Sequence, residues 1–497
     1  MPKETEEIPF VSIQLDDSSS VPIYKQLYNA IRESILLGRL KREQKLPSTR
    51  TLAKELKVSR NTVILAFEQL IAEGYVKGIA GAGTYVADDI PDKLLKIKKK
   101  PEHFEDGLIN TPRSDKRLNP PSSSQLYMPE NNIIPFQHGI PSVEDFPFDK
   151  WLKIFNKIVR GFTINQLSKI DRTGYKALKE AIAKYLQTYR AVNCTPEQIF
   201  IVNGSQQGLY LISRVLLKEK DKVLLEDPFY FGVRDAICSA KVNIIPVPVD
   251  EEGLRVDYAI KNFPEANLIY TTPSHQYPLG STLSISRRLK LLEFAGKNNI
   301  WIIEDDYDGE FRYAGNPLPS LQGMDKWGQV IYIGTFSKVL FPGLRLGYLV
   351  LPSLDLVNSF TAEKSIIDRQ SPILEQLVTA KFMEEGYFTT HIRKMRMLYK
   401  ERQEFLINEI NKEIGNLITI RPSASGMHVI AWLPEYLDDK EVSKILRNNK
   451  LVVYPLSKCI LKYKRKPALI LGYTAFNKDE IKRGINILRD IIKSLCR

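Results

Sequence analysis

The sequence has few cysteines, and it contains no apolar run long enough to span a bilayer. Its four cysteines, Cys194, Cys238, Cys459 and Cys496, lie far apart. This scatter excludes a CxxC zinc motif and a dense disulfide framework, and it fits a reducing compartment. The first residues, MPKETEEIPF, are polar and acidic and lack the basic and then apolar profile of a signal peptide. We therefore expect a cytoplasmic protein.

Negative charge is also in deficit. Lys and Arg together number 71 and Asp and Glu together number 58, which gives a formal net charge of +13 and a pI of about 9.2. Such an excess favours a polyanion such as DNA as a partner, although charge alone does not identify one. With 497 residues, the chain is long enough for more than one domain of about 100–200 residues.

Three helices and a short hairpin are predicted between residues 20 and 88. Ile23, Leu27, Ile31 and Ile35 recur at helical spacing in the first helix. Two further helices are predicted on either side of a turn at Val58 and Ser59, and two short strands surround a group of glycines. This order predicts a winged helix-turn-helix, whose recognition helix lies in the major groove of DNA. Periodicity alone leaves open a small helical domain with a solvated basic face.

The candidate DNA contacts lie at the starts of the predicted helices. Arg60, Asn61 and Thr62 begin the recognition helix, and Arg50 begins the helix before it. The stretch LPSTRTLAKELKVSRNTVILAFEQL resembles the GntR-type winged-helix repressors, and the resemblance extends over about residues 21–86. It implies that these four residues contact double-stranded DNA and that Thr84 lies at the wing.

A change of composition marks residues 89–131. KLLKIKKK is rich in lysine, and PRSDKRLNPPSSS belongs to a following stretch rich in Pro, Ser, Asn and charge. Such a composition buries too little apolar area to fold alone, so we predict a flexible linker. Its lysines either contact DNA phosphates or are simply solvated.

Short apolar strands alternate with amphipathic helices from residue 132 to 497, which predicts an α/β domain with a largely parallel sheet. Ligands of such sheets bind at the carboxyl ends of the strands. Polar residues follow several of the predicted strands. They are the Asn-Gly-Ser-Gln turn at 203–206, Tyr230, the pair Asp305 and Asp306, and Lys338 at the end of IYIGTFSK.

These side chains suit the parts of a pyridine aldehyde that carries a phosphate. A lysine at the end of a buried strand loses its proton more easily and becomes a nucleophile for an aldehyde. A carboxylate beside a pyridine nitrogen keeps that nitrogen protonated. A glycine turn at a helix N-terminus offers free N–H groups to a phosphate. Taken singly, each residue has an ordinary alternative: a solvated lysine, a core tyrosine, an acidic surface loop.

Taken together, the turns resemble those of the fold-type I aminotransferases. TPSHQYPLG (272–280), EDDYDGEFRY (304–313) and GTFSKVLFPGLRLGY (334–348) are similar in particular to the MocR-type regulators. Those proteins join a GntR-type DNA-binding domain to an aminotransferase-like domain. The resemblance implies a fold-type I PLP-dependent transferase-like large domain with a smaller C-terminal subdomain. It also implies a head-to-tail homodimer in which each linker crosses to the partner chain.

The resemblance further implies a site for pyridoxal 5'-phosphate and no metal site. Lys338 would form the Schiff base, Asp305 would pair with the pyridine nitrogen, and Tyr307 would contact the ring hydroxyl. Tyr230 would stack on the ring. The residues expected to hold the phosphate are Ser205, Gln206, Thr335, Ser337 and Arg345. Either His275 or Tyr277 would lie near the ring oxygen, and the sequence leaves both open.

One position departs from the family pattern. Aminotransferases carry an arginine in a C-terminal strand that reads roughly Leu-Arg-Leu-Gly-Phe, and this arginine holds the substrate carboxylate through two parallel hydrogen bonds. Here the strand reads Leu-Ile-Leu-Gly-Tyr, with Ile470 in the place of the arginine. An isoleucine cannot pair with a carboxylate, so we do not expect efficient transamination. Arg234, Lys464 and Arg465 are the alternative cations.

We therefore expect a PLP-dependent transcription regulator whose aminotransferase-like domain senses a small effector. The effector is either pyridoxal phosphate itself or an amine or amino acid derivative. An active aminotransferase with an accessory DNA-binding head is the alternative function. A domain that has lost the cofactor and serves only in dimerisation is the third.

Overall fold

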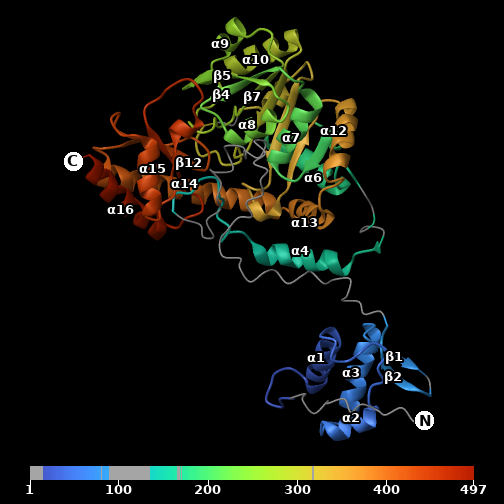
Figure 1. Cartoon of the computed structure of the whole chain (residues 1–497). Helices are drawn as coiled ribbons and strands as arrows, with labels where there is room; N and C mark the ends of the chain where they lie inside the picture. The colour runs from blue at the N-terminus through green and yellow to red at the C-terminus, as the bar shows by residue number, and fades with distance from the viewer. Residues whose placement is uncertain are drawn as a thin grey trace, which may run out of the picture. The chain divides into compact units, whose positions relative to one another are not determined.

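The computed structural model describes residues 15–79, 81–88, 135–164, 168, 171–315 and 318–496. The chain divides into two compact units, Met1–Leu118 and Asn119–Arg497, shown in Figure 1. The predicted linker at 89–131 lies outside the described residues. Within the described ranges, no helix is both long and apolar enough to cross a membrane.

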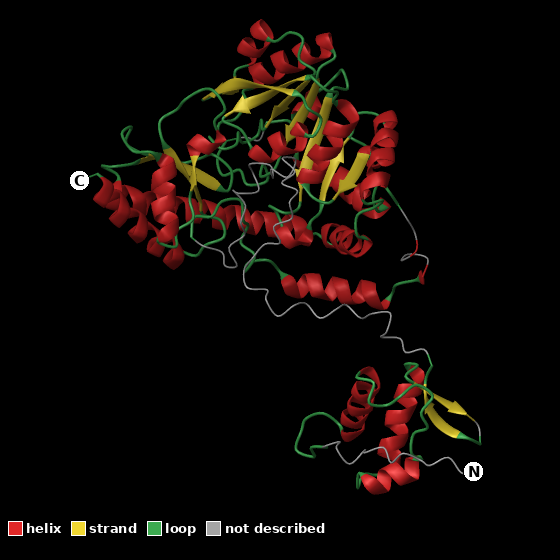
Figure 2. Cartoon of the chain, in the orientation of Figure 1, coloured by secondary structure: helices red, strands yellow, loops and turns green. Residues whose placement is uncertain are grey.

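The described part of the first unit contains three helices followed by a hairpin (Figure 2). The elements are α1 (Ile23–Leu36), α2 (Thr49–Glu55), α3 (Arg60–Ala72), β1 (Val76–Ile79) and β2 (Gly83–Val86). Leu27, Leu52 and Val63 are fully buried where the helices meet. The Ser59 hydroxyl accepts a hydrogen bond of 3.1 Å from the Thr62 N–H, which caps α3 where the sequence predicts the recognition helix. The predicted winged helix-turn-helix is confirmed.

The second unit is built on an eight-stranded sheet with the order β3-β10-β9-β8-β7-β4-β5-β6. The strands are β3 (Ile199–Val202), β4 (Lys222–Asp227), β5 (Asn243–Asp250), β6 (Gly253–Leu254), β7 (Leu268–Thr271), β8 (Trp301–Asp305), β9 (Val330–Thr335) and β10 (Gly347–Val350). Strands β5, β4, β7, β8 and β9 run parallel, whereas β10 is antiparallel to both of its neighbours. The largely parallel sheet that the sequence predicts is thus present, with β6 antiparallel to β5 at one edge and β10 following the Lys338 turn.

Helices cover both faces of this sheet. They are α6 (Lys176–Tyr189), α7 (Ser205–Leu216), α8 (Phe231–Cys238), α9 (Val256–Asn262), α10 (Ile285–Asn298), α11 (Leu321–Met324), α12 (Leu354–Ile367) and α13 (Ile373–Glu384), and α4 (Phe148–Arg160) packs on α13. Helices α7, α8 and α12 pack on one face, and α9 and α10 pack on the other (Figure 1). The alternation of side chains along each strand explains this division, since Leu225 joins the first core and Leu224 the second.

A smaller C-terminal subdomain has a four-stranded sheet of its own, with the order β11-β12-β14-β13. Its strands are β11 (Thr419–Ile420), β12 (His428–Trp432), β13 (Tyr454–Pro455) and β14 (Ala468–Gly472), and its helices are α14 (Tyr387–Ile414), α15 (Asp439–Asn448) and α16 (Lys478–Leu495). Helix α14 belongs to both parts. Ile392 packs in the core of the large domain, whereas Leu406 and Ile410 pack in the core of the subdomain. The predicted division into a large domain and a smaller subdomain is confirmed.

Candidate functional site

A cavity lies where the parallel strands of the large sheet end and the C-terminal subdomain begins. Because β7, β8 and β9 run parallel, residues after their carboxyl ends meet at one edge. The cavity is lined by His138, Gly139, Ser205, Tyr230, Tyr270, Thr272, Tyr277, Asp305, Tyr307, Thr335, Lys338, Met427 and His428. Seven of these were predicted from the sequence as site residues: Ser205, Tyr230, Tyr277, Asp305, Tyr307, Thr335 and Lys338.

Lys338 extends its amine into this cavity from the turn that follows β9. Its Nζ donates a hydrogen bond of 2.7 Å to the backbone carbonyl of Gly139. Burial lowers the pKa of Lys338 below its usual value, since desolvation disfavours the ammonium form. Gly139 is needed at this contact because it has a φ of +74° and a Cβ there would lie 2.9 Å from Nζ. The amine is therefore held in a fixed place and is more readily neutral than a surface lysine.

Asp305 lies at the end of β8 in the same cavity, and its two oxygens have different surroundings. Oδ2 accepts a hydrogen bond of 2.7 Å from the Tyr270 hydroxyl. Oδ1 is buried and has no hydrogen-bond partner among the described residues. Burial raises the pKa of this carboxyl to about 7. A buried acceptor without a partner costs free energy, so Oδ1 suits a ligand that brings an N–H donor.

Aromatic side chains form another part of the cavity wall. Tyr230 and Tyr277 meet edge to face, with ring centroids 5.6 Å apart and planes at 80°. The Tyr277 hydroxyl lies 2.8 Å from His138 Nε2. His138 is buried, and desolvation holds its pKa well below the usual value, so the ring is neutral. These rings offer a flat, largely apolar surface to a planar ligand.

The start of α7 gives the cavity an anion-binding character. Gly204 precedes the helix with a φ of +87°, and within the described part of the chain no side-chain hydrogen bond caps the helix start. Arg345 lies beside this turn, and its Nη2 is 3.4 Å from the Asn203 carbonyl oxygen. The Ser337 hydroxyl is buried and lacks a hydrogen-bond partner among the described residues. N–H groups, a hydroxyl and a guanidinium are the donors that a phosphate takes up.

Three of the predicted phosphate residues, Gln206, Ser337 and Arg345, lie outside the cavity lining. The Ser337 N–H donates to the hydroxyl of Thr335, which lines the cavity, and Arg345 lies beside Gly204, the residue before Ser205. The Gln206 amide turns away and donates a hydrogen bond of 2.8 Å to the Gly232 carbonyl.

The two residues that the sequence left as alternatives for the ring oxygen have different places. Tyr277 lines the cavity, whereas His275 does not. His275 lies behind Tyr307, with Nδ1 2.9 Å from the Tyr307 hydroxyl and 3.0 Å from Asp308 Oδ2. The sequence signal could not separate them, because both belong to one irregular turn in which no periodicity fixes the direction of a side chain.

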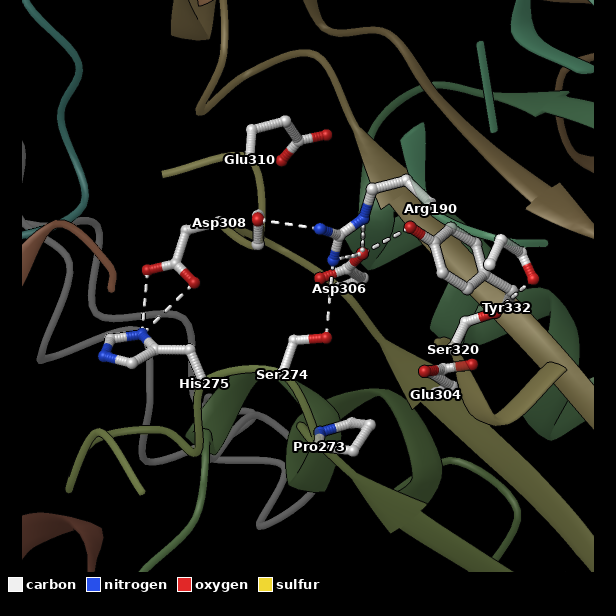
Figure 3. Close-up of polar contacts among 12 residues, drawn as sticks. Arg190, Pro273, Ser274, His275, Glu304, Asp306, Asp308, Glu310, Ser320 and Tyr332 are labelled. Atoms are coloured by element: carbon white, nitrogen blue, oxygen red, sulfur yellow. Dashed lines mark hydrogen bonds and ion pairs between the residues drawn. The ribbon is translucent and has the colours of Figure 1, made fainter. Parts of the chain in front are cut away.

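The acidic segment at the end of β8 divides its side chains between two directions. Asp305 and Tyr307 face the cavity. Glu304 accepts hydrogen bonds of 2.9 Å from the backbone N–H groups of Leu321 and Gln322. Asp306 pairs with Arg190, with Nε at 2.8 Å, and accepts a hydrogen bond of 2.5 Å from Tyr332 (Figure 3). Asp306 therefore anchors the segment, and the two neighbouring aspartates do not act as a pair.

Ile470 is fully buried in the middle of β14. It pairs with Ile430 on β12 and Tyr454 on β13, and it shares an apolar cluster with Tyr277. Among the described residues that line the cavity, none of the alternative cations, Arg234, Lys464 and Arg465, is present.

The candidate DNA contacts gather at the starts of two helices in the first unit. Arg50, Arg60 and Asn61 are exposed, and Arg60 Nε lies 3.4 Å from the Thr49 hydroxyl. Thr84 is part of β2, opposite Gly78. The arrangement leaves two guanidinium groups and an amide open to solvent, which suits contacts to phosphates and base edges.

Comparison with known proteins gives two family matches and a set of relatives. Residues 131–484 match the model of aminotransferase class I and II, and residues 23–86 match that of the gntR family of bacterial regulatory proteins. The chain is 36% identical to the probable rhizopine catabolism regulatory protein MocR of Rhizobium meliloti, over 97% of this chain and 96% of that protein. It is 30% identical to the HTH-type transcriptional regulator TauR of Rhodobacter capsulatus, over 90% and 92% of the two chains.

Solved structures resemble the second unit. Pyrococcus horikoshii kynurenine aminotransferase, in complex with PMP, is similar with a TM-score of 0.70 and 28% identity over 77% of this chain and 97% of that one. The α-aminoadipate aminotransferase LysN from Thermus thermophilus, complexed with N-(5'-phosphopyridoxyl)-L-leucine, has a TM-score of 0.68 and 26% identity over 73% and 93% of the chains.

Proposed function

The chain belongs to the MocR-type transcription regulators, which join a gntR-family DNA-binding domain to an aminotransferase class I and II domain, and on this basis we propose that its large domain carries pyridoxal phosphate on Lys338 as a sensor. The aminotransferase fold family uses this cofactor. The observation that carries the proposal is one cavity that holds both a lysine amine of lowered pKa and a buried carboxylate oxygen without a partner.

The described residues fit the cofactor at both of its ends. The unpartnered Oδ1 of Asp305 suits a protonated pyridine nitrogen, and the Tyr307 hydroxyl suits the ring oxygen. The unpartnered hydroxyl of Ser337 and the open start of α7 suit the phosphate. When bound, pyridoxal phosphate supplies an aldehyde that reacts with amines and a ring that withdraws electrons. Burial lowers the pKa of the Lys338 amine, and the aromatic side chains of the cavity would orient the ring.

The site at Ile470 supports sensing over turnover. A substrate carboxylate placed against this strand would meet apolar side chains, and an unpaired buried charge costs a few kcal/mol or more. We infer that an ordinary amino acid is not held in the usual orientation. The proposed effector is therefore pyridoxal phosphate itself, which would make the protein a sensor of vitamin B6 supply, or an amine or amino acid derivative held by other residues.

Effector binding is proposed to act through a head-to-tail dimer. Two winged heads on one dimer bind two half-sites, and a change of dimer geometry alters the spacing that they can reach. Arg50, Arg60, Asn61, Thr62 and Thr84 are the proposed DNA contacts.

Covalent trapping tests the cofactor assignment. The purified chain is loaded with pyridoxal phosphate, reduced with borohydride and digested, and the modified peptide is identified by mass spectrometry. We expect the label on Lys338. Lys364 is a matched internal control, because it is buried but paired with Asp368 at 2.9 Å and lies outside the cavity. Labelling spread over surface lysines, or unchanged in Lys338→Ala, would contradict the proposal.

An active aminotransferase with a DNA-binding head is the second candidate. It is favoured by the similarity to aminotransferases, such as aromatic-amino-acid aminotransferase 1 of Thermococcus litoralis, with 28% identity over 73% of this chain. Incubation of the loaded protein with a panel of amino acids distinguishes the two. Release of a keto acid over repeated turnovers would favour the enzyme, and its absence would favour the sensor.

A further inference from the structure

We propose that His275 is a positioning residue that fixes the direction of the Tyr307 hydroxyl and connects it to the turn formed by Ser423–Gly426, between β11 and β12 of the C-terminal subdomain. This inference rests on the proposed function, because it concerns how the Tyr307 hydroxyl meets the ring oxygen of the cofactor. In this role His275 acts on the cofactor through Tyr307 and does not itself line the cavity.

The contacts of Nδ1 determine where its hydrogen lies. His275 is 2% exposed, and Nδ1 is 3.0 and 3.2 Å from the two oxygens of Asp308 and 2.9 Å from the Tyr307 hydroxyl (Figure 3 shows His275 and Asp308). Carboxylate oxygens accept hydrogen bonds, so we assign the hydrogen of the ring to Nδ1. The Tyr307 oxygen then accepts from the same N–H, and its own hydrogen cannot point toward His275.

The hydrogen of Tyr307 is therefore left for the cavity. The His275 ring occupies the side of the Tyr307 hydroxyl that faces away from the cavity lining, at 2.9 Å. Tyr307 lines the cavity, where the ring oxygen is proposed to lie. A hydroxyl that accepts one hydrogen bond is a stronger donor of another, because the two bonds polarise each other. The imidazole thus sets both the direction and the strength of the Tyr307 donor.

The opposite edge of the ring touches the C-terminal subdomain. Nε2 lies 3.3 Å from the Ser423 hydroxyl, which in turn accepts the Ser425 N–H at 3.4 Å. In the tautomer that carries its hydrogen on Nδ1, Nε2 is an acceptor, and Ser423 donates to it. Hydrogen bonds therefore run in one direction from the Ser423–Gly426 turn, through His275, to the cavity.

Two glycines leave the space that the imidazole occupies. A Cβ on Gly426 would lie 1.9 Å from Cε1 of His275, and a Cβ on Gly280 would lie 3.1 Å from Nε2. Both glycines have a positive φ, +94° and +80°, which other residues rarely adopt. Gly426 belongs to the same turn as Ser423, so a movement of this turn displaces His275 and with it the Tyr307 hydroxyl.

The test measures the pH midpoint of the change in absorbance of the bound cofactor. A donor to the ring oxygen favours its charged form, so loss of the donor raises the pH midpoint of that change. We expect His275→Leu to raise the midpoint by about one pH unit, the size that one hydrogen bond to a charged oxygen supplies. His275→Asn places an amide N–H near the position of Nδ1 and should recover most of the wild-type midpoint. Ser423→Ala should raise the midpoint by a smaller amount.

The combination with Tyr307→Phe separates positioning from general damage. If His275 acts through Tyr307, then Tyr307→Phe and the double variant Tyr307→Phe with His275→Leu have the same midpoint. The groups that surround Tyr307, namely Asp308, Tyr277, Asp305 and Glu226, are unchanged in all of these proteins. Additive shifts in the double variant, or a wild-type midpoint in His275→Leu with cofactor bound, would overturn the inference. A wild-type protein with no cofactor absorbance would instead overturn the proposed function on which it rests.

Discussion

Replacement of Asp305 with asparagine should weaken the binding of pyridoxal phosphate with little change in shape. Asparagine retains the volume of the side chain and an oxygen that can accept from Tyr270, whose hydroxyl lies 2.7 Å from Oδ2. The change removes the negative charge and replaces the Oδ1 oxygen with an amide nitrogen, which cannot accept a hydrogen bond. In the wild-type protein Oδ1 has no partner among the described residues. The cofactor's pyridine nitrogen would then lose the group that keeps it protonated.

A hydrogen bond to a charged group contributes about 1.5–3 kcal/mol. This corresponds to a loss of about tenfold to about a hundredfold in cofactor affinity. Part of the loss is offset, because the free protein no longer carries a buried carboxylate whose pKa burial raises to about 7. The lower end of the range is therefore expected at neutral pH.

Affinity is measured by titration of the cofactor-free protein with pyridoxal phosphate while the absorbance of the bound cofactor is recorded. Glu304→Gln is the matched control. Glu304 is the preceding residue on β8, is fully buried and also has a pKa raised to about 7, but it faces Leu321 and Gln322 rather than the cavity. Its variant should bind the cofactor within about twofold of wild type if the fold is kept. Equal affinity in Asp305→Asn and wild type, or an equal loss in both variants, would refute the assignment of Asp305.

Three further predictions concern the same account. The pKa of Asp305 is about 7 in the folded protein, and its ordinary value is 3.8, so the folded state retains a proton that the unfolded state releases between these pH values. The stability of the cofactor-free protein should therefore fall as pH rises through this range. Thermal melts at a series of pH values should show a smaller fall in Asp305→Asn, and identical profiles would contradict the prediction. Gly139→Ala should displace the Lys338 amine, because the added Cβ would lie 2.9 Å from Nζ at a φ of +74°. The absorbance titration should then show a loss of at least about tenfold in cofactor affinity, and an unchanged titration would contradict the prediction. The double variant Arg60→Ala with Asn61→Ala should lose about 1–3 kcal/mol of binding free energy for promoter DNA for each base that the two side chains no longer hydrogen-bond, and it should keep the cofactor absorbance. Fluorescence anisotropy measures the DNA affinity. Wild-type DNA affinity in this variant would show that the recognition helix lies elsewhere.

Much of the site could be predicted because the fold brings strand ends together. Asp305 and Thr335 are the last residues of neighbouring parallel strands, and Lys338 follows the second of them closely. A polar residue at such a strand end has its direction fixed by the sheet, so a motif in the sequence translates directly into a place in the cavity.

The residues that the sequence did not reveal lie far from the motifs. Gly139 meets Lys338 across 199 positions of the chain, and His428 comes from the first residue of a strand in the C-terminal subdomain. Arg190, which anchors Asp306, lies after the end of α6 and 116 positions away. No local periodicity connects such pairs, because their contact depends on how separate elements pack. The Gly139 contact with Lys338 in particular could be seen only in three dimensions.

The affinity of the full chain for its promoter DNA, measured with the cavity in different states, shows whether the large domain acts as a sensor. The states are cofactor-free, loaded with pyridoxal phosphate, and loaded with the cofactor in the presence of a panel of amines and amino acids. We expect the DNA affinity to differ by several-fold between at least two of these states. We expect this difference to disappear in Lys338→Ala, which retains the winged helix-turn-helix domain. The same DNA affinity in every state of the wild-type protein would contradict it.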